Sequence, residues 1–221
     1  MPEHAMWYRI APFAAYVFFM LLADLLSILG WNSYELRWLY AVKIMVVVIL
    51  LWKLSGHYKE LALPRFISWN TWAIAVLAGV GIFLAWINLT TDWMVTGQSA
   101  GFDPRQNNAI SPALALMRWS GAALVIPVME ELFWRSFVLR WLSQANFLAL
   151  DPAQVSWRAF VLTAVLFAVQ HHLWLAGLMA GMAYGALYMY SRSLWPAIVA
   201  HAVTNFLLGG WILYTGNWNF W

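Results

Sequence analysis

Long apolar runs separated by short polar connections dominate the sequence. A helix that crosses a bilayer needs about 20 mainly apolar residues, and seven apolar segments of roughly this kind can be drawn along the chain. These segments are residues 10–30, 36–54, 71–90, 112–141, 157–172, 174–190 and 194–214. The pattern predicts an all-α fold, a polytopic transmembrane bundle of about seven to eight helices.

Composition supports the same class of protein. Of the 221 residues, 64% are hydrophobic and 10% are charged, and the mean hydropathy is +0.69, whereas soluble domains carry about 25% charged residues. The net charge of +3 is small and spread over connections, so it bears on topology and gives no support for nucleic-acid binding. The absence of cysteine excludes thiolate metal sites, disulfides and a cysteine nucleophile.

The distribution of Lys and Arg predicts the orientation. Basic residues collect on the cytoplasmic side of membrane proteins, and a cytoplasmic N-terminus places most basic residues of the connections on that side. They are Arg9, Lys53, Lys59, Arg65, Arg140, Arg158 and Arg192. The basic residues left on the outer side of the membrane are mainly Arg37 and Arg105. We expect a multi-pass protein with its N-terminus in the cytoplasm and its first helix retained, not cleaved as a signal peptide.

Charged side chains inside the predicted helix 112–141 are the main anomaly in this apolar sequence. An ionised group near the bilayer centre costs roughly 2.5–3.5 kcal/mol on insertion scales, so such groups are candidates for function. Glu131 and Arg135 are four residues apart and share a helix face, while Glu130 is turned by about 100°. We expect Arg135 to hold Glu131 and to leave Glu130 facing the bundle. Pro127 should free a backbone carbonyl near both acids.

Two later helices add polar side chains at compatible depths. Phe167 and His171 are four residues apart, so their rings lie on one helix face; His172 follows directly, and the spacing from Phe167 favours His171. His201 and Asn205 also share a face. At about 1.5 Å of rise per residue, these groups and the carboxylates reach similar depths in the cytoplasmic half of the membrane. One shared polar site is geometrically possible.

Other polar and small residues inside the predicted helices have structural explanations. Asp24 and Lys43 lie on consecutive helices, where charged groups usually pair with one another or extend to the membrane surface. Gly177, Gly181 and Gly185 are spaced by four and predict a helix face that packs closely against a neighbour. The polar groups of the later helices could likewise have purely structural roles, as ion pairs, helix caps and interhelical hydrogen bonds.

The chemistry that suits the polar set as a whole is hydrolysis. A buried carboxylate at Glu130 can take a proton from water, and His171 can orient that water or carry the proton. His201 and Asn205 can donate hydrogen bonds to a developing oxyanion. The sequence contains neither a GxSxG nucleophile motif nor an HExxH zinc motif.

Metal-dependent hydrolysis stays open as an alternative. Glu130, His171 and His201 are residue types that could bind zinc and its water. The neighbouring Arg135 would oppose a cation, and the HExxH spacing is missing. We therefore expect catalysis without a cofactor, with zinc on those three residues as the alternative.

The polar residues form three short motifs in order on successive predicted helices. They are Glu130-Glu131-x-x-x-Arg135, Phe167-x-x-x-His171 and His201-x-x-x-Asn205. This ordered set resembles the CAAX protease and bacteriocin-processing family, also called the ABI family. The small, membrane-only chain is also similar to the bacterial branch found beside exosortase and PEP-CTERM sorting systems.

The resemblance implies an intramembrane endopeptidase that acts on a membrane-anchored or lipidated substrate. It divides the chain into accessory helices, residues 1–110, and a four-helix catalytic core, residues 111–221. It implies the bacterial inner membrane as the location. The roles it implies are water activation by Glu130 with His171, support of that site by Glu131 and Arg135, and an oxyanion hole at His201 and Asn205.

A protein that is not an enzyme is the other possibility for the same cavity. A transporter could relay protons through these groups, although no inverted repeat is visible in the sequence. A peptide-binding or immunity protein would need a similar cavity without cutting its ligand. The residue types alone do not separate these functions.

Overall fold

The fold is described for most of the chain. In the computed structural model the described residues are 2–32, 34–62, 67–97, 99 and 101–221. Arg65, one of the basic residues used to predict the orientation, lies outside them. Within the described residues the chain forms seven helices, and one of them changes its winding along its length and is labelled α4 and α5. The predicted all-α transmembrane bundle is confirmed.

The helices follow the predicted apolar segments in order. They are α1 (Pro2–Ile28), α2 (Arg37–Lys53), α3 (Trp69–Asn88), α4 (Pro112–Ser120), α5 (Ile126–Glu131), α6 (Trp157–Val169), α7 (Trp174–Ser191) and α8 (Leu194–Thr215). The α4–α5 helix is continuous over Pro112–Leu139 and includes π-helical stretches at Gly121–Val125 and Leu132–Leu139. A short antiparallel hairpin joins α3 to α4, formed by β1 (Arg105–Gln106) and β2 (Ala109–Ile110).

Short 3₁₀ turns and local capping signals shape the connections. The 3₁₀ turns are Ser55–His57, Lys59–Leu61, Asp92–Met94, Phe147–Ala149, Pro152–Gln154 and Trp218–Phe220. Ser68, Ser156 and Ser193 each precede a helix and accept a hydrogen bond from a backbone N–H of its first turn. At the other end of α8, Gly216 takes a left-handed φ of 72°, which closes the helix.

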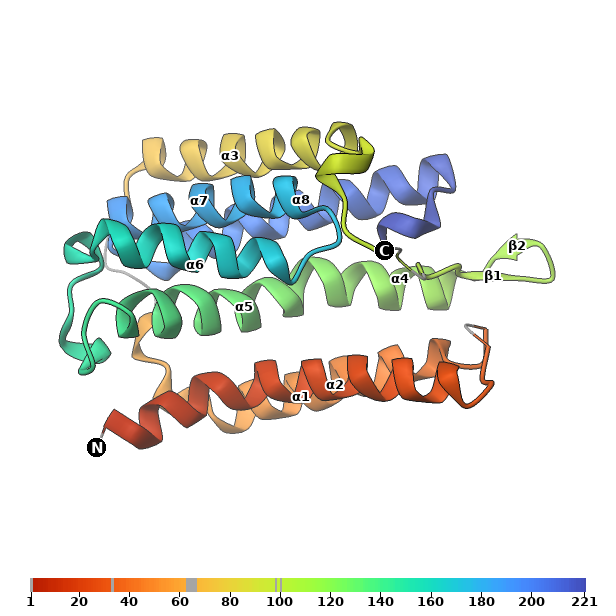
Figure 1. Ribbon diagram of the computed structural model, residues 1–221, viewed down its shortest axis with the longest axis horizontal. Coiled ribbons are helices and arrows are strands. Elements are labelled where there is room, and N and C mark those ends of the chain that lie inside the picture. The colour runs from red at the N-terminus through yellow and green to blue at the C-terminus, as the bar shows by residue number, and fades with distance from the viewer. Residues whose placement is uncertain (1, 33, 63–66, 98, 100) are drawn as a thin grey trace.

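The α4–α5 helix lies in the middle of the molecule. Figure 1 shows α1 and α2 on one side of it, and α6, α7, α8 and α3 on the other. Glycines mark the closest helix contacts. A Cβ atom at Gly79 of α3 would lie 2.5 Å from the carbonyl oxygen of Ala200 in α8, and one at Gly181 of α7 would lie 2.9 Å from Cα of Ala164 in α6. The predicted close packing of the glycine face of α7 is thereby confirmed.

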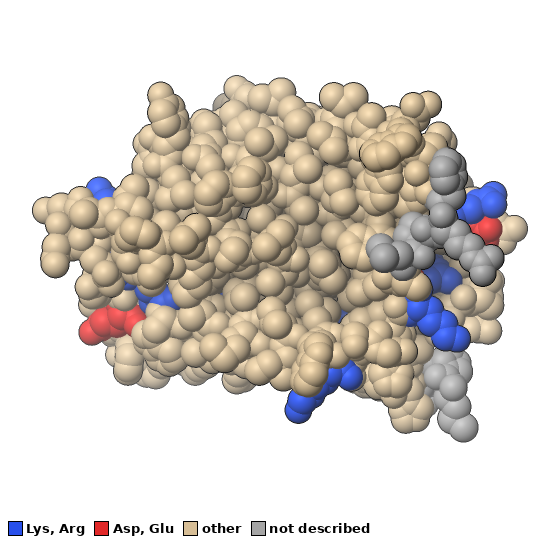
Figure 2. Space-filling view, turned by 180° about the vertical axis from the view of Figure 1, so that it is seen from behind, with Lys and Arg blue, Asp and Glu red and all other residues tan. Residues whose placement is uncertain are grey.

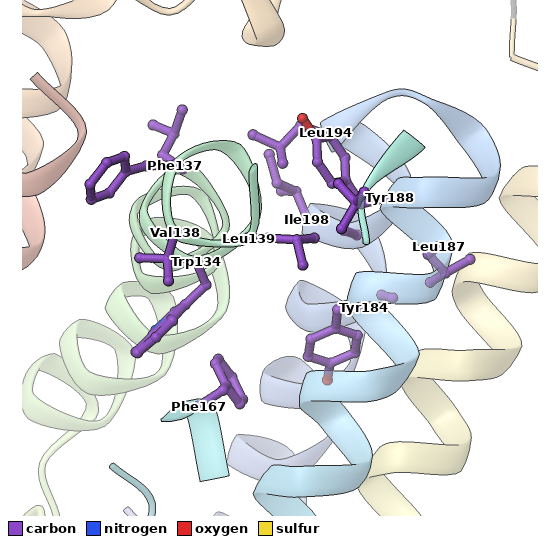
Figure 3. Close-up of a cluster of buried hydrophobic side chains, with 14 of the residues drawn as sticks. Trp134, Phe137, Val138, Leu139, Phe167, Tyr184, Leu187, Tyr188, Leu194 and Ile198 are labelled. Carbon is purple, nitrogen blue, oxygen red and sulfur yellow. The ribbon is translucent and has the colours of Figure 1, made fainter. Parts of the chain in front are cut away.

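A cluster of buried apolar side chains joins the α4–α5 helix to α6, α7 and α8. Figure 3 shows Trp134 and Phe167 near one another at one side of this cluster, and Leu139 between the long helix and the α8 residue Ile198. The rings of Trp134 and Phe167 meet edge to face, with their centroids 5.9 Å apart. Because Phe167 also contacts the site residue His171, the apolar core holds the polar groups in position.

The outer surface is suited to lipid. Within the described residues, four helices are long and apolar enough to cross a membrane, namely α1, α3, the α4–α5 helix and α8. Large apolar side chains on their outer faces are exposed, for example Leu77 at 69% and Leu124 at 68%. Figure 2 shows one long face on which uncharged surface fills the middle and most charged side chains lie toward the two ends. The chain is an integral membrane protein.

Two helix ends differ by more than two residues from those predicted. Helix α1 begins at Pro2 instead of residue 10, because Arg9 is 1% exposed and its guanidinium is neutralised by a paired bond to Glu60. Arg9 is therefore part of the helix rather than a loop charge. Helix α6 ends at Val169 instead of residue 172, so His171 lies in the turn that follows.

Candidate active site

The two carboxylates follow a widened turn of the α4–α5 helix. At this turn the N–H of Ile126 bonds the carbonyl of Gly121, five residues back. The next donor in that register would be Pro127, which has no N–H, so the carbonyl of Ala122 receives no bond from it. The amide nitrogen of Asn205 on α8 donates to that carbonyl at 2.9 Å. The carbonyl expected to be freed by Pro127 is thus bonded by a predicted site residue.

Glu131 is completely buried and holds two partners on one oxygen. Its Oε1 accepts a hydrogen bond from Arg135 Nη1 at 3.0 Å and lies 2.9 Å from His201 Nδ1. Arg135 is 1% exposed, donates to the carbonyl of Gly181 at 3.4 Å, and lies over the ring of Phe167 with 4.4 Å to its centroid. The predicted pair of Glu131 with Arg135 is present. The contact of His201 with Glu131 was not anticipated from the sequence.

Glu130 has different surroundings from its neighbour. Its side chain is buried, and its Oε2 has no hydrogen-bond partner among the described protein groups. It lines a cavity of about 160 Å³ together with His171, His201 and Asn205. A buried carboxylate oxygen without a protein partner is costly for stability. Oε2 of Glu131 also has no partner among the described groups, so the feature that distinguishes Glu130 is the cavity, which Glu130 lines and Glu131 does not.

The structure distinguishes His171 from His172. His171 Nδ1 lies 2.7 Å from the carbonyl oxygen of Phe167, and its ring faces the cavity and meets the edge of Trp86. His172 is half-buried, like His171, but its Nδ1 lies 2.5 Å from the carbonyl oxygen of Thr96, and it does not line the cavity. His171 therefore both caps the end of α6 and lines the cavity, while His172 bonds the connection after α3.

The hydrogen bonds of the two cavity histidines fix their ring nitrogens. A carbonyl only accepts, so Nδ1 of His171 carries a proton, and Nε2 of the neutral ring is left as an acceptor. His201 directs its Nδ1 at the carboxylate of Glu131, and its ring stacks on Tyr184 with centroids 5.0 Å apart. Each histidine thus has one committed nitrogen and one uncommitted nitrogen, Nε2.

Sequence reasoning missed several residues of the cavity wall. Tyr184 donates through its hydroxyl to Oγ1 of Thr204 at 2.7 Å, and Thr204 in turn donates to the carbonyl of Gly79 at 2.8 Å. This chain ties α3, α7 and α8 together behind His201. The only signals were a tyrosine inside the glycine face of α7 and a threonine beside Asn205, and neither stands out in an apolar helix.

For Asp24 and Lys43 we expected either a pair or extension to the membrane surface, and the pair is not found among the described residues. The Lys43 amine instead lies over the ring of Tyr16, 4.1 Å from its centroid. A tyrosine ring attracts a cation through its quadrupole, so no carboxylate is needed to hold the amine. Tyr16 and Arg118 also line the cavity that contains Glu130, and sequence reasoning singled out neither.

The zinc alternative is not supported by the placement of its predicted ligands. In the described part of the chain, no three His, Asp or Glu side chains are grouped as a metal site would require. One predicted ligand, His201, directs a nitrogen at Glu131, which also pairs with the cation Arg135. We therefore propose a mechanism that uses no metal ion.

Fold and cavity together define an integral membrane protein with a buried polar site suited to hydrolysis. Residues 112–207 match the family model described as type II CAAX prenyl endopeptidase Rce1-like. The match confirms the predicted family: this segment is a CAAX protease-like domain, at the family level that of a membrane endopeptidase. Comparison with curated proteins found no match, and neither did comparison with solved structures.

The matched segment contains all three sequence motifs and covers somewhat less than half of the chain. It begins at Pro112, at the start of α4. The division into accessory helices and a catalytic core stays a prediction, as does the narrower likeness to the branch beside exosortase systems.

Proposed function

We propose that the chain is an intramembrane endopeptidase of the glutamate type, which hydrolyses a peptide bond of a membrane-anchored or lipidated substrate. The observation that carries this proposal is the position of Glu130, a buried carboxylate that accepts no hydrogen bond from the described protein groups and lies in the cavity shared with His171 and His201. Ion pairing does not account for Glu130, since Arg135 bonds Glu131 instead. A carboxylate held in this way is suited to act as a general base.

The proposed reaction needs only water and the substrate. Water is held between Glu130 and the free Nε2 of His171, and its oxygen attacks the peptide carbonyl carbon as Glu130 takes one of its protons. The oxyanion that forms accepts hydrogen bonds from His201 and Asn205. When the C–N bond breaks, Glu130 passes its proton to the leaving nitrogen. The products are a new carboxyl terminus and a new amine.

Charge balance supports this assignment of protons. Donation to the oxyanion from Nε2 of His201 requires a proton there in addition to the one directed at Glu131. A doubly protonated His201 and Arg135 together match the two negative charges of Glu130 and Glu131, so these four side chains are neutral as a group before the reaction; Arg118, which also lines the cavity, is not part of this balance. Glu131 and Arg135 are positioning residues in this scheme, because they act through His201.

Catalysis without metal has a direct test. Dialysis of the detergent-solubilised enzyme against a strong chelator should leave its cleavage rate unchanged, because no residue in the scheme uses a cation. Metal content is measured before and after treatment by mass spectrometry. Loss of activity that returns specifically with added zinc would replace the scheme by a metal-dependent one.

The decisive variant is Glu130→Gln. It keeps the shape of the side chain and removes the base, so cleavage should fall by at least about 100-fold. Glu35→Gln is the matched control, because Glu35 is an exposed carboxylate in the connection after α1. Substrates are sought by comparing the termini of membrane proteins, by mass spectrometry, in cells that carry each variant or the unmodified chain.

Two outcomes would contradict the proposal. An unchanged set of termini in the Glu130→Gln cells, at equal protein levels, would exclude Glu130 as the base. If the Glu130→Gln protein still performs its cellular role although it cuts nothing, the alternative of a transporter or a peptide-binding or immunity protein is favoured.

We further propose the bacterial inner membrane as the location, with the N-terminus in the cytoplasm.

A further inference from the structure

A second and larger cavity adjoins the catalytic one. It measures about 730 Å³ and lies between the α1–α2 pair, the start of the α4–α5 helix and the segment Trp218–Trp221. Figure 1 shows this region at the end of the molecule that carries the hairpin. Tyr16, Arg118 and Trp221 line both cavities, so the two share a wall and lie side by side.

The lining of the second cavity is positively charged. It contains four cationic and two acidic side chains, an excess of two positive charges: Arg37, Lys43, Arg105, Arg118, Asp24 and Asp103. Arg105 is paired with Asp103 at 2.6 Å, and its hydrogen bonds lower the pKa of that carboxyl. Arg37 donates to the backbone carbonyls of the same two residues. Both of these cations are occupied in holding the hairpin.

The remaining two cations are held by aromatic rings. The guanidinium of Arg118 lies 4.5 Å from the ring centroid of Tyr40 and donates to its hydroxyl at 3.2 Å. The amine of Lys43 lies 4.1 Å from the ring centroid of Tyr16 and 5.1 Å from that of Tyr40. Neither cation has a carboxylate partner among the described residues.

This arrangement contrasts with two of the other buried arginines, whereas Arg140 is likewise without a carboxylate and donates to backbone carbonyls. Arg9 pairs with Glu60, and Arg135 pairs with Glu131. Aromatic rings orient a cation without cancelling its charge. Arg118 therefore keeps a positive potential in a partly enclosed space, and Lys43 adds to it in its protonated form, which favours binding of an anion.

We propose that Arg118 and Lys43 bind a carboxylate of the peptide substrate, on one side of the bond that is cut. The inference rests on the proposed function, because only a peptide held at Glu130 would extend from the catalytic cavity past Arg118 into the second one. Arg118 precedes Glu130 by 12 positions on one helix, or about 18 Å at 1.5 Å per residue. An extended peptide covers about 3.3 Å per residue, which places the carboxylate within about five residues of the scissile bond.

A carboxylate can come from an Asp or Glu side chain or from the carboxyl terminus of the peptide. Three dye-labelled apolar hexapeptides distinguish these sources: one with a free terminus, one amidated, and one amidated with Asp as its last residue. Binding is measured by fluorescence anisotropy to the Glu130→Gln protein in phosphatidylcholine nanodiscs, so that no peptide is cut. We expect the fully amidated peptide to bind at least about tenfold more weakly than the better of the other two.

Variants assign the effect to the cavity. Arg118→Gln and Lys43→Met should reduce binding of the carboxylate peptide and leave the amidated peptide unaffected, and Arg118→Lys should recover part of the loss. Arg158→Gln is the matched control. Arg158 is an exposed arginine that lies near a tryptophan ring, and it lines neither cavity. It should bind all three peptides as the parent protein does.

Several results would overturn the inference. Equal binding of the acidic and amidated peptides would exclude a carboxylate site, and so would an equal loss of both on Arg118→Gln. Loss of peptide binding when phosphatidylglycerol replaces phosphatidylcholine would assign the two cations to a lipid headgroup instead. The proposed function fails separately, if the unmodified protein cuts no membrane peptide although the carboxylate preference holds.

Discussion

At the scale of residues, one helical position separates two different roles for the same side chain. Glu130 and Glu131 are adjacent, yet Glu131 has both Arg135 and His201 on one oxygen while Glu130 faces the cavity. The offset of about 100° between neighbouring helical residues is enough to predict this division. The sequence could not predict the contact from His201, because it depends on how α8 packs beside the α4–α5 helix.

The buried pair of Glu131 and Arg135 predicts a non-additive effect on stability. Glu131→Gln leaves the arginine buried without its counter-charge and should lower the free energy of unfolding by about 3–5 kcal/mol. The double variant with Arg135→Met should recover most of that loss, since no buried charge is then unpaired, but it should stay inactive because His201 lacks its partner. Unfolding in detergent and cleavage are measured on the same samples.

An exposed pair provides the comparison for that experiment. Asp103 and Arg105 are 42% and 50% exposed, so Asp103→Asn should cost at most about 1 kcal/mol. Equal losses at the two pairs would show that Glu131 and Arg135 are screened by solvent and do not form a buried pair.

The adjacent histidines offer a matched test of the cavity. His171→Ala should reduce cleavage by at least about 100-fold, because it removes the nitrogen that orients the water. His172→Ala should stay within about threefold of the parent, since His172 bonds the carbonyl of Thr96 outside the cavity. Initial rates are compared on one substrate. A larger effect at His172 would reverse the assignment that the spacing from Phe167 first indicated.

At the scale of elements, apolar length predicted the seven helices and their order, and spacing by four predicted the glycine contact of α7. Two of the missed features involve partners outside the residue's own helix. Arg9 was expected in a loop because its partner, Glu60, is 51 positions away. Arg140 was expected as a charge at the membrane surface, yet it is 7% exposed and donates to the carbonyls of Leu148 and Leu150. A one-dimensional pattern does not contain such pairings.

The widened turn before Glu130 links two elements through Asn205. Asn205→Ala should cost about 1–3 kcal/mol of unfolding free energy, because it leaves the carbonyl of Ala122 without a donor. In a Pro127→Ala background the same change should cost less, since the new N–H at position 127 can bond that carbonyl within the helix. The four proteins form a double-mutant cycle. Strict additivity would show that Pro127 and Asn205 do not act on one carbonyl.

At the scale of the whole molecule, the charged ends determine how the bundle lies in the membrane. Figure 1 shows the N-terminus at one end of the helices and the hairpin at the other. Lys59 and Arg158 are exposed near the first end, and Arg105 is exposed in the hairpin. Arg9 and Arg140 are buried and contribute less to the surface charge than their sequence positions indicated. The exposed cations still favour a cytoplasmic N-terminus.

The absence of cysteine makes that orientation directly testable. Lys59→Cys and Gln106→Cys each place one thiol at an exposed position, the first in the connection after α2 and the second in the hairpin. In intact cells, a membrane-impermeant maleimide should label Cys at position 106 and not at position 59, while disrupted cells should label both. The reverse labelling pattern would show that the bundle has the opposite orientation in the membrane. The second cavity, which lies at the hairpin end, would then open toward the cytoplasm, and the acidic peptides offered to it would have to be cytoplasmic.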